Sequence, residues 1–447
     1  MNGKTLRLAS WGRLYRAETL AYRPERVGEV AAAVAGRSHP RGLIAYGRGR
    51  SYGDAPLNSG GETLLTERLN RLLSFDESSR ALVCEAGVTF NELMSVFLPR
   101  GFLAPVSPGT GFATIGGAVA NDVHGKNHDH AGSFGRHVEW LDLVLPAGEV
   151  RRVSRQETPD LFAATVGGVG LTGIILQVCF RLTPVPSSRL TVHERRIPNL
   201  DAFIGAFEEQ RSRATYSVGW IDGLARGAAM GRGILETAEF AESGAFAVPP
   251  GPSRRVPLDL PAFALNPLTV RAFNELYFNR FRGDARTRTV PARDFFYPLD
   301  ALRDWNRIYG RKGFHQFQCV LPNEAARPGL RRLLTEVSAA RAASFLAVLK
   351  TLGDEGPGYL SFPMRGFTLA LDFPGRPGAP DLLARLQDIV CDHGGRVYLA
   401  KDAVLTPERF RRMYPKLDAF RTVLGSIDPE CRFRSDLERR LRIRGDP

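Results

Sequence analysis

One stretch, residues 105–137, constrains this chain more than any other. It is dense in glycine, contains four histidines and carries small polar side chains between them. Because glycine lets a ligand approach the backbone closely, Gly109, Gly111, Gly116 and Gly117 can present bare N–H groups to a phosphate or a ring carbonyl. We interpret the stretch as the wall of a polar ligand site, with a glycine-rich surface loop as the alternative.

Other residues of the same stretch favour the ligand site. Thr110 and Thr114 add hydroxyl groups, and the apolar run 118–120 predicts a helical turn whose N-terminus faces the same anion. The histidines have few acidic partners at metal-ligand spacing, so we expect no metal. Proton transfer or a hydrogen bond to a cofactor suits a histidine here better, because its ordinary pKa lies near neutral.

Length and composition limit the class of protein. With 447 residues, 43% of them hydrophobic, the chain can form two or three domains. It has no apolar run long enough to span a bilayer and no apolar core of a secretory signal, so we expect a cytoplasmic protein. Its five cysteines form no CxxC pair, which argues against structural zinc and a disulfide framework.

The net charge of +13 indicates an anionic partner. The basic residues are spread along the chain and form no recognisable nucleic-acid module, so we expect no nucleic acid. An acidic small substrate and an anionic membrane surface both fit this charge.

Local patterns in the first half predict helices and strands joined by glycine-rich turns. Residues 23–37 have helical spacing, 43–46 form an apolar strand, and a helix begins after Thr89 and ends at Gly101. The glycines of 47–53 have GxGxxxG spacing with no helix after them, which excludes a Rossmann loop. The backbone N–H groups of this turn, with Arg48 and Arg50 beside them, still suit a pyrophosphate. A hairpin turns at 147–148, and the GxGxxG at 168–173 precedes a strand at 174–182.

The second half, from about residue 186, is typical of an antiparallel α+β domain. Residues 244–291 predict either a long, partly mobile excursion or a short amphipathic helix with an apolar face. Alternation places Gln316 with Gln318 on one strand face, and Thr368, Ala370 and Asp372 on another. A strand at 397–400 delivers Lys401 and Asp402, and helices follow. The motifs of P-loop nucleotide hydrolases, HExxH zinc enzymes and GxSxG hydrolases are missing from the sequence.

Six motifs carry a resemblance to a known family. They are GRGRSYGD (47–54), PVSPGTGFATIGGAVANDVHGKNHDHAGSFGRHV (105–138), GGVGLTGIILQV (167–178), FHQFQCVLP (314–322), SFPMRGFTLALDFP (361–374) and VYLAKDAVLTPERFRRMYPKLDAF (397–420). Together they resemble the vanillyl-alcohol-oxidase type of flavin oxidoreductase. Within that family the resemblance is greatest to oxidases of polyprenylphosphoryl pentoses, and it covers nearly the whole chain in order.

The resemblance implies a fold and a cofactor. The fold is α+β and two-lobed, with an FAD-binding domain at 1–188 that is completed by 396–447, and an antiparallel-sheet substrate domain at 189–395. FAD lies between the lobes. The residues implied in cofactor binding are Gly47, Arg48, Gly49, Arg50, Ser51, Tyr52, Gly109, Thr110, Thr114, Gly116, Gly117, Asn121, Gly125, Gly170, Ile175 and Tyr398. Relatives with covalent flavin often have a histidine in the first loop, where this chain has Tyr52, so we expect non-covalent FAD.

The resemblance also implies the reaction. FAD takes a hydride from the C2′ carbon of a polyprenylphosphoryl-β-D-ribose, as the first half of an epimerisation toward an arabinose donor for cell-wall polysaccharide. Lys401 stabilises negative charge and His124 is a candidate proton acceptor. The residues implied in substrate binding are Tyr52, Lys126, Tyr297, Gln316, Gln318 and Lys350. The expected partners are a separate NAD(P)H-dependent reductase and, by peripheral contact, the inner face of the membrane.

Two other functions stay open at this point, and one residue differs from the family pattern. The chain could be a flavin oxidase of a soluble polyol, sugar or aldonolactone, or a basic binding module without catalysis. Mycobacterial members of the family have a cysteine where this chain has Ala370. That difference leaves the sugar and the lipid length open.

Overall fold

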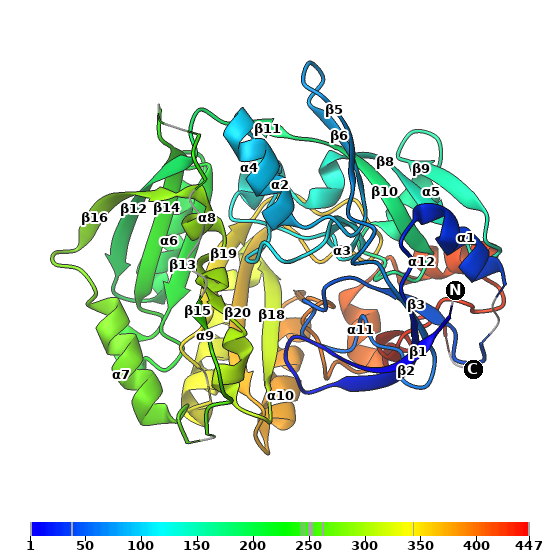
Figure 1. The fold of residues 1–447 in the computed structure, drawn as a ribbon. Coiled ribbons are helices and arrows are strands. Elements are labelled where there is room, and N and C mark those ends of the chain that lie inside the picture. Colours follow the sequence, from blue (N-terminus) through cyan, green and yellow to red (C-terminus); the bar gives the residue numbers. More distant parts are fainter. Residues whose placement is uncertain are drawn as a thin grey trace.

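The computed structural model describes residues 2–36, 39–242, 244, 246–248, 254–261, 263–342 and 344–445. Within them the chain forms two lobes built on separate sheets, as Figure 1 shows. The predicted α+β class is confirmed.

The first lobe contains two sheets. The N-terminal sheet has the order β1-β2-β4-β3, in which β2, β4 and β3 are parallel. The second sheet is antiparallel, with the order β5-β6-β10-β8-β9. Their strands are β1 (Lys4–Ala9), β2 (Arg16–Tyr22), β3 (Leu43–Tyr46), β4 (Glu62–Leu65), β5 (Leu72–Asp76), β6 (Ala81–Glu85), β8 (Val138–Val144), β9 (Val150–Ser154) and β10 (Ile174–Arg181).

Short helices fill the space around these sheets. They are α1 (Val27–Ala35), α2 (Phe90–Phe97), α3 (Ile115–Ala120), α4 (His128–Ala131) and α5 (Pro159–Thr165). Helix α2 begins as predicted, because the hydroxyl of Thr89 accepts the N–H of Glu92 and the Glu92 carboxylate accepts the N–H of Thr89. The chain then leaves the helical region at Gly101, whose φ is +83°. The predicted strands at 43–46 and 174–182 and the hairpin at 147–148 are confirmed.

The second lobe is built on one eight-stranded antiparallel sheet, with the order β16-β12-β14-β13-β19-β20-β18-β21. Its strands are β12 (Arg189–Ile197), β13 (Tyr216–Ile221), β14 (Gly233–Phe240), β16 (Ala285–Pro291), β18 (Phe314–Pro322), β19 (Ala347–Leu352), β20 (Gly366–Pro374) and β21 (Arg396–Val397). Two small pairs complete the strands: β7 (Phe102–Leu103) with β11 (Thr183–Pro184), and β15 (Arg254–Arg255) with β17 (Leu302–Arg303).

Side-chain alternation gives the large sheet two different faces. Phe317, Cys319 and Leu321 of β18 point into a core with leucines of the helices on that side. Gln316 and Gln318 point the opposite way, as the sequence predicts. The helices of this lobe are α6 (Leu200–Gln210), α7 (Pro267–Phe278), α8 (Ala292–Phe296), α9 (Asn323–Ala340) and α10 (Ala379–Asp392).

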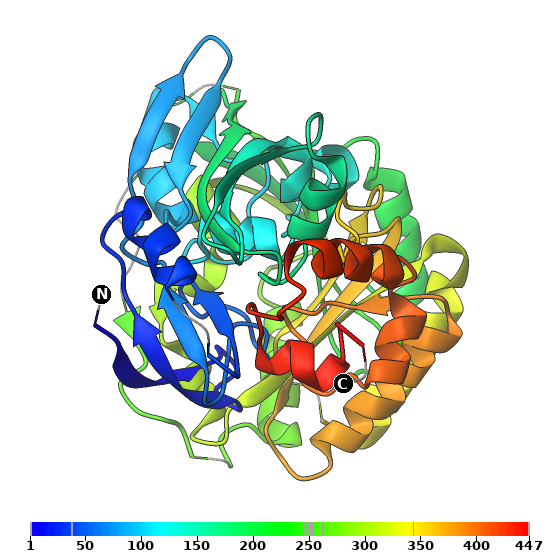
Figure 2. The same cartoon turned by 90° about the vertical axis from the view of Figure 1, so that its right-hand side faces the viewer.

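The C-terminal part of the chain returns to the first lobe. Figure 2 shows its helices beside the N-terminal strands. Phe433 packs in the core with Leu43 and Leu64, and the N–H of Leu43 donates to the carbonyl of Arg432 at 2.8 Å. These helices are α11 (Pro407–Met413), α12 (Leu417–Ile427) and α13 (Asp436–Leu441), and the 3₁₀ helices are Leu98–Arg100, Phe134–His137, Gly227–Ala229, Pro298–Ala301 and Trp305–Tyr309.

The structure corrects one predicted segment and confirms one alternative for a second. The strand predicted at 397–400 is shorter, since β21 ends at Val397 and the chain turns so that the N–H of Lys401 donates to the carbonyl of Tyr398 at 2.9 Å. This turn directs Lys401 toward the space between the lobes. Within 244–291 the predicted amphipathic helix is confirmed as α7, and strand β16 follows it; 245, 249–253 and 262 lie outside the described residues.

Candidate active site

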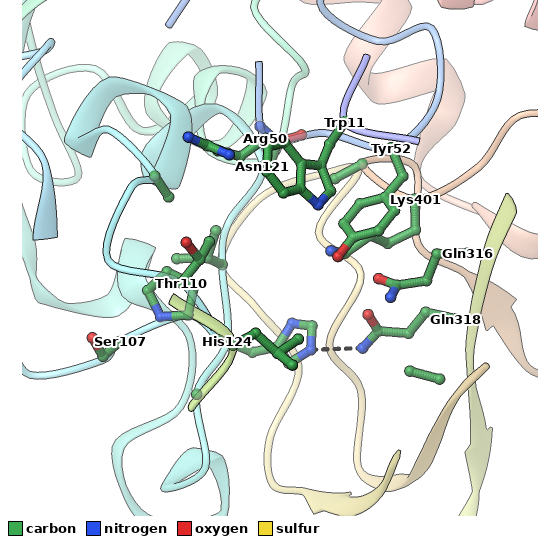
Figure 3. Close-up of a pocket in the computed structure, with 18 of the residues that line it drawn as sticks. Trp11, Arg50, Tyr52, Ser107, Thr110, Asn121, His124, Gln316, Gln318 and Lys401 are labelled. Carbon is green, nitrogen blue, oxygen red and sulfur yellow. Dashed lines mark hydrogen bonds between the residues drawn. The ribbon is translucent and has the colours of Figure 1, made fainter. Parts of the chain in front are cut away.

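A cavity of about 720 Å³ lies between the two lobes. The first lobe contributes the loops around Gly49 and Gly109, and the second contributes the polar face of its eight-stranded sheet. Figure 3 shows side chains from both lobes around this space. A cavity of this size fits a ligand larger than a simple metabolite.

Two glycine-rich loops form the wall on the first lobe, and glycine is required where they meet other groups. Gly49 has a φ of +59°, and a Cβ there would lie 2.0 Å from the hydroxyl of Tyr46. A Cβ on Gly47 would lie 2.7 Å from the hydroxyl of Thr114 in the second loop. The two loops are therefore in contact.

Buried polar atoms without partners show that this wall is made for a polar ligand. Arg50 lies between the rings of Trp11 and Phe112, 4.1 Å and 4.9 Å from their centroids, and its Nε has no partner. Asn121 donates from Nδ2 to the carbonyl of Gly117 at 2.9 Å, while its Oδ1 is unpaired. Such groups are unfavourable when buried alone, so a ligand that satisfies them is expected. An anionic group would match Arg50, and a hydrogen-bond donor would match the Asn121 oxygen.

His124 is held in a neutral form on the cavity wall. The amide Nε2 of Gln318 donates to its Nε2 at 2.8 Å, as Figure 3 shows. Its Nδ1 is buried and unpaired. Burial, with further effects of Lys350, His128 and Lys401, lowers the pKa of His124 well below its usual 6.5. Because the amide nitrogen of Gln318 can only donate, Nε2 of His124 accepts, and the proton of the neutral ring lies on Nδ1.

Lys401 lines the same cavity, and the fully buried Asp372 lies near enough for each charge to influence the pKa of the other. The Lys401 ammonium lies 3.7 Å from the ring centroid of Tyr52. Burial lowers its pKa to about 7, despite the opposing effect of Asp372. Burial raises the pKa of Asp372 to about 7, while hydrogen bonds from Gln316 at 2.6 Å and Tyr309 at 2.9 Å act against that rise. Groups with such shifts are typical of proton-transfer sites.

Two further lysines enter the same cavity without a carboxylate partner among the described residues. Lys126 lies over the ring of Phe295, 3.9 Å from its centroid, and donates to the Phe295 carbonyl. Burial lowers the pKa of Lys126 to about 8. It also lowers the pKa of Lys350 to about 8, with a contribution from the neighbouring Lys126. The cavity therefore carries uncompensated positive charge.

The structure brings nearly all predicted site residues together. The cavity is lined by both predicted catalytic residues, by all the predicted cofactor residues and by five of the predicted substrate residues: Tyr52, Lys126, Gln316, Gln318 and Lys350. Tyr297 is the exception. It is buried behind the wall, where its hydroxyl forms a 2.6 Å hydrogen bond with Ser107. Ser107 is the residue of this pair that lines the cavity.

Sequence reasoning missed several residues of the wall. Strand register predicts some of them, because Trp220 pairs with Val348, Val348 with Ala370, and Ala370 with Gln318 across one sheet face. A basic cluster at the opposite sheet edge carries no local motif. It consists of Arg280, Arg286 and Arg288 around the carboxylates of Glu194 and Glu236. Trp11 also lines the cavity and carries no motif of its own.

Comparison with known proteins identifies the class to which this fold and site belong. Residues 19–154 match the FAD binding domain family, and residues 377–441 match the D-arabinono-1,4-lactone oxidase family. The chain is an FAD-dependent oxidoreductase of the vanillyl-alcohol-oxidase type.

Sequence identity to individual proteins shows which family within this class the chain belongs to. The chain is 36% identical over 456 residues to decaprenylphosphoryl-beta-D-ribose oxidase of Mycolicibacterium smegmatis, which covers 98% of both proteins. It is 37% identical over 368 residues to an uncharacterised protein of Streptomyces coelicolor, covering 79% of this chain and 100% of that protein. D-arabinono-1,4-lactone oxidase of Eremothecium gossypii is 25% identical over 239 residues, with 52% and 44% covered. The chain belongs to the decaprenylphosphoryl-β-D-ribose oxidase family.

Proposed function

We propose that this protein oxidises the C2′ hydroxyl of a polyprenylphosphoryl-β-D-ribose to the 2′-keto sugar. This oxidation is the first half of an epimerisation toward an arabinose donor for cell-wall polysaccharide. The full-length similarity to the Mycolicibacterium smegmatis oxidase supports this substrate class.

The charge of the cavity is the observation that carries the proposal. Among the residues that the structure describes, eight cationic side chains and two carboxylates line it. Two of the cations, Lys126 and Lys350, form no ion pair with a carboxylate of the described residues, and burial lowers the pKa of each to about 8. Holding charged lysines in such a place is unfavourable unless an anion enters. After the diphosphate of FAD, a substrate phosphodiester supplies a further negative charge.

The residues around Lys401 suit removal of a hydroxyl proton. FAD, when bound, accepts the hydride from the carbon of the alcohol. Lys401 is partly neutral near pH 7 because its pKa is about 7, so it can accept the hydroxyl proton and keep the resulting charge beside the sugar. His124, with its proton on Nδ1, donates a hydrogen bond and orients the ligand. This arrangement favours Lys401 over His124 as the proton acceptor.

We propose that FAD is bound non-covalently and lies between a flavin domain (1–188 with 396–447) and a substrate domain (189–395). Arg48, Arg50 and the glycine loops would hold its diphosphate. His124 is the only histidine among the described residues lining the cavity, and no cysteine lines it there. Its Nε2 is already engaged by Gln318, which does not favour a covalent link at that atom.

The proposed substrate determines the proposed partners. A separate NAD(P)H-dependent reductase would reduce the keto sugar, and we propose peripheral contact with the inner face of the membrane that contains the lipid. None of the described helices combines the length and apolarity needed to cross a bilayer.

Oxidation of a soluble polyol, sugar or aldonolactone is the alternative. The match of residues 377–441 to the D-arabinono-1,4-lactone oxidase family favours it. A neutral lactone, however, leaves Lys126 and Lys350 without an anion. Steady-state oxidation of a short-chain prenylphosphoryl ribose, its dephosphorylated counterpart and an aldonolactone separates these functions. We expect a clear preference for the phosphorylated sugar, and equal or faster oxidation of the lactone would favour the alternative.

A further inference from the structure

Exposed apolar side chains are concentrated on one part of the surface. Of the eight large apolar side chains exposed among the described residues, six lie in segment 258–276. They are Leu258, Leu260, Phe263, Leu268, Phe273 and Leu276. The other two, Leu73 and Val150, lie in strands of the first lobe. Single exposed apolar residues are ordinary, but such a concentration indicates an interaction surface.

Helix α7 within this segment is fixed to the protein by its inner face. Val270 and Asn274 are buried, and Asn274 donates to the Asp222 carboxylate at 2.7 Å. The ring of Tyr277 lies 4.7 Å from that of Trp220. Just after the helix, Arg280 donates to Glu236 at 2.8 Å. The orientation of α7 is therefore set, and its outer face is a defined surface.

The outer face of α7 is apolar. Leu268, Ala272 and Leu276 follow one another at four-residue spacing and lie on one side of the helix. The two leucines are 76% and 75% exposed. Figure 1 shows α7 at the outer edge of the molecule, beside the edge of the eight-stranded sheet.

Unpaired positive charge lies on α7 and just after it. Arg271 of the helix and Arg282, which follows shortly after its end, are exposed and form no ion pair with a carboxylate of the described residues. In contrast, the nearby carboxylate Asp259 is paired with Arg13, and Glu275 with Arg232. An apolar face flanked by unpaired arginines is the pattern of a helix that lies in the interface of an anionic bilayer.

The same helix also leads into the cavity. Phe273 and Tyr277 of α7 line the cavity, while Leu268 and Leu276 face outward. A prenyl chain that leaves the bilayer here meets apolar and aromatic side chains between the surface and the polar end of the cavity. A second copy of this chain fits the surface poorly, because it would bring the same unpaired arginines together in a protein of net charge +13.

We propose that the outer face of α7, together with Leu258, Leu260 and Phe263, forms a docking surface for an anionic lipid bilayer. The role of this surface in delivering a lipid substrate rests on the proposed function, but binding to the bilayer does not. Leu268 and Leu276 insert among the acyl chains, and the arginines contact lipid phosphates.

Vesicle co-sedimentation of the flavin-loaded full chain tests this docking surface. The vesicles are pure phosphatidylcholine, or phosphatidylcholine with phosphatidylglycerol. The test variant is Leu268→Glu with Leu276→Glu, and the matched control is Leu73→Glu with Val150→Glu, which makes the same charge change at exposed apolar residues elsewhere. A Leu268→Ser and Leu276→Ser variant removes the apolar contact without adding charge.

We expect the wild type to prefer anionic vesicles. Both α7 variants should bind them at least about tenfold more weakly, because two exposed leucines lose their apolar burial, while the control variant binds like the wild type. Equal binding by the α7 variants, equal loss in the control, or no preference for anionic vesicles would overturn the docking surface. So would self-association of the wild type through this face without vesicle binding.

A soluble substrate separates this inference from the proposed function. The α7 variants should keep full flavin content and oxidise a short-chain prenylphosphoryl ribose at the wild-type rate. If the wild type oxidises no such sugar and the vesicle results still hold, the proposed function fails and the docking surface stands. If the sugar is oxidised and vesicles are not bound, the reverse is true.

Discussion

Replacing Lys350 with methionine should make the protein more stable and a poorer catalyst. Methionine keeps most of the aliphatic length of lysine and removes the buried charge. Burial, and secondarily Lys126, lowers the pKa of Lys350 from its usual 10.5 to about 8. That difference corresponds to about 3 kcal/mol of unfavourable free energy in the folded protein at neutral pH, as an upper estimate.

The pH dependence identifies the cause of this stabilisation. Below about pH 8 the lysine is charged in both the folded and unfolded states. The full free-energy cost of burying the charge then applies, so Lys350→Met raises the free energy of unfolding most in this range. Between about pH 8 and 10.5 the folded state has lost the proton that the unfolded state still binds, so wild-type stability rises and the advantage of the variant shrinks. Above 10.5 the advantage is gone.

Thermal unfolding of the flavin-loaded enzyme, followed by flavin fluorescence at pH 7 and pH 9.5, measures this effect. Lys312→Met is the control, because Lys312 is exposed and its replacement should change stability by no more than about 0.5 kcal/mol. In the same preparation, the KM for an anionic prenylphosphoryl ribose should rise in Lys350→Met and stay unchanged in Lys312→Met. A Lys350→Met enzyme that is less stable at pH 7, or whose gain is the same at both pH values, would refute the reasoning.

Three further predictions concern the site. Lys401→Ala should reduce kcat by about 100-fold or more with little loss of bound flavin, as for removal of a general base, and wild-type turnover would remove Lys401 from the site. KM for the phosphorylated sugar should rise as pH passes about 8, where Lys126 and Lys350 lose their charge. A KM that does not change with pH in the wild type would contradict binding of the phosphate by these two lysines. So would the same rise in a Lys126→Met and Lys350→Met double variant. Heat-denatured enzyme should release all its flavin into the supernatant, and yellow precipitated protein would contradict non-covalent binding.

Local sequence rules predicted the parts of the fold that depend on neighbouring residues. The Thr89–Glu92 cap, the left-handed Gly101 and the alternation that places Gln316 with Gln318 are of this kind. Strand 397–400 was predicted too long, because its end depends on a distant contact: the N–H of Tyr52 donates to the carbonyl of Ala400 at 2.9 Å. That contact joins segments far apart in the chain and has no local signal.

The site shows the same division. Glycine-rich loops have a local signature, and the cavity residues they contain could be named from sequence. The Glu194 cluster could not, because it joins β12, β14, β16 and the end of α7 by strand register and by one long side chain. For Tyr297 the family resemblance predicts a position at the substrate. In the structure its hydroxyl contacts Ser107, and of these two residues it is Ser107 that lines the cavity.

The most direct test of the proposed function is an absorbance spectrum of the purified enzyme, followed without oxygen as polyprenylphosphoryl ribose is added. The spectrum should show bound flavin, and its visible bands should bleach within the mixing experiment, with the dephosphorylated sugar reacting far more weakly. Flavin bands that stay unchanged with the phosphorylated sugar, and bleach with an aldonolactone, would contradict the proposed substrate.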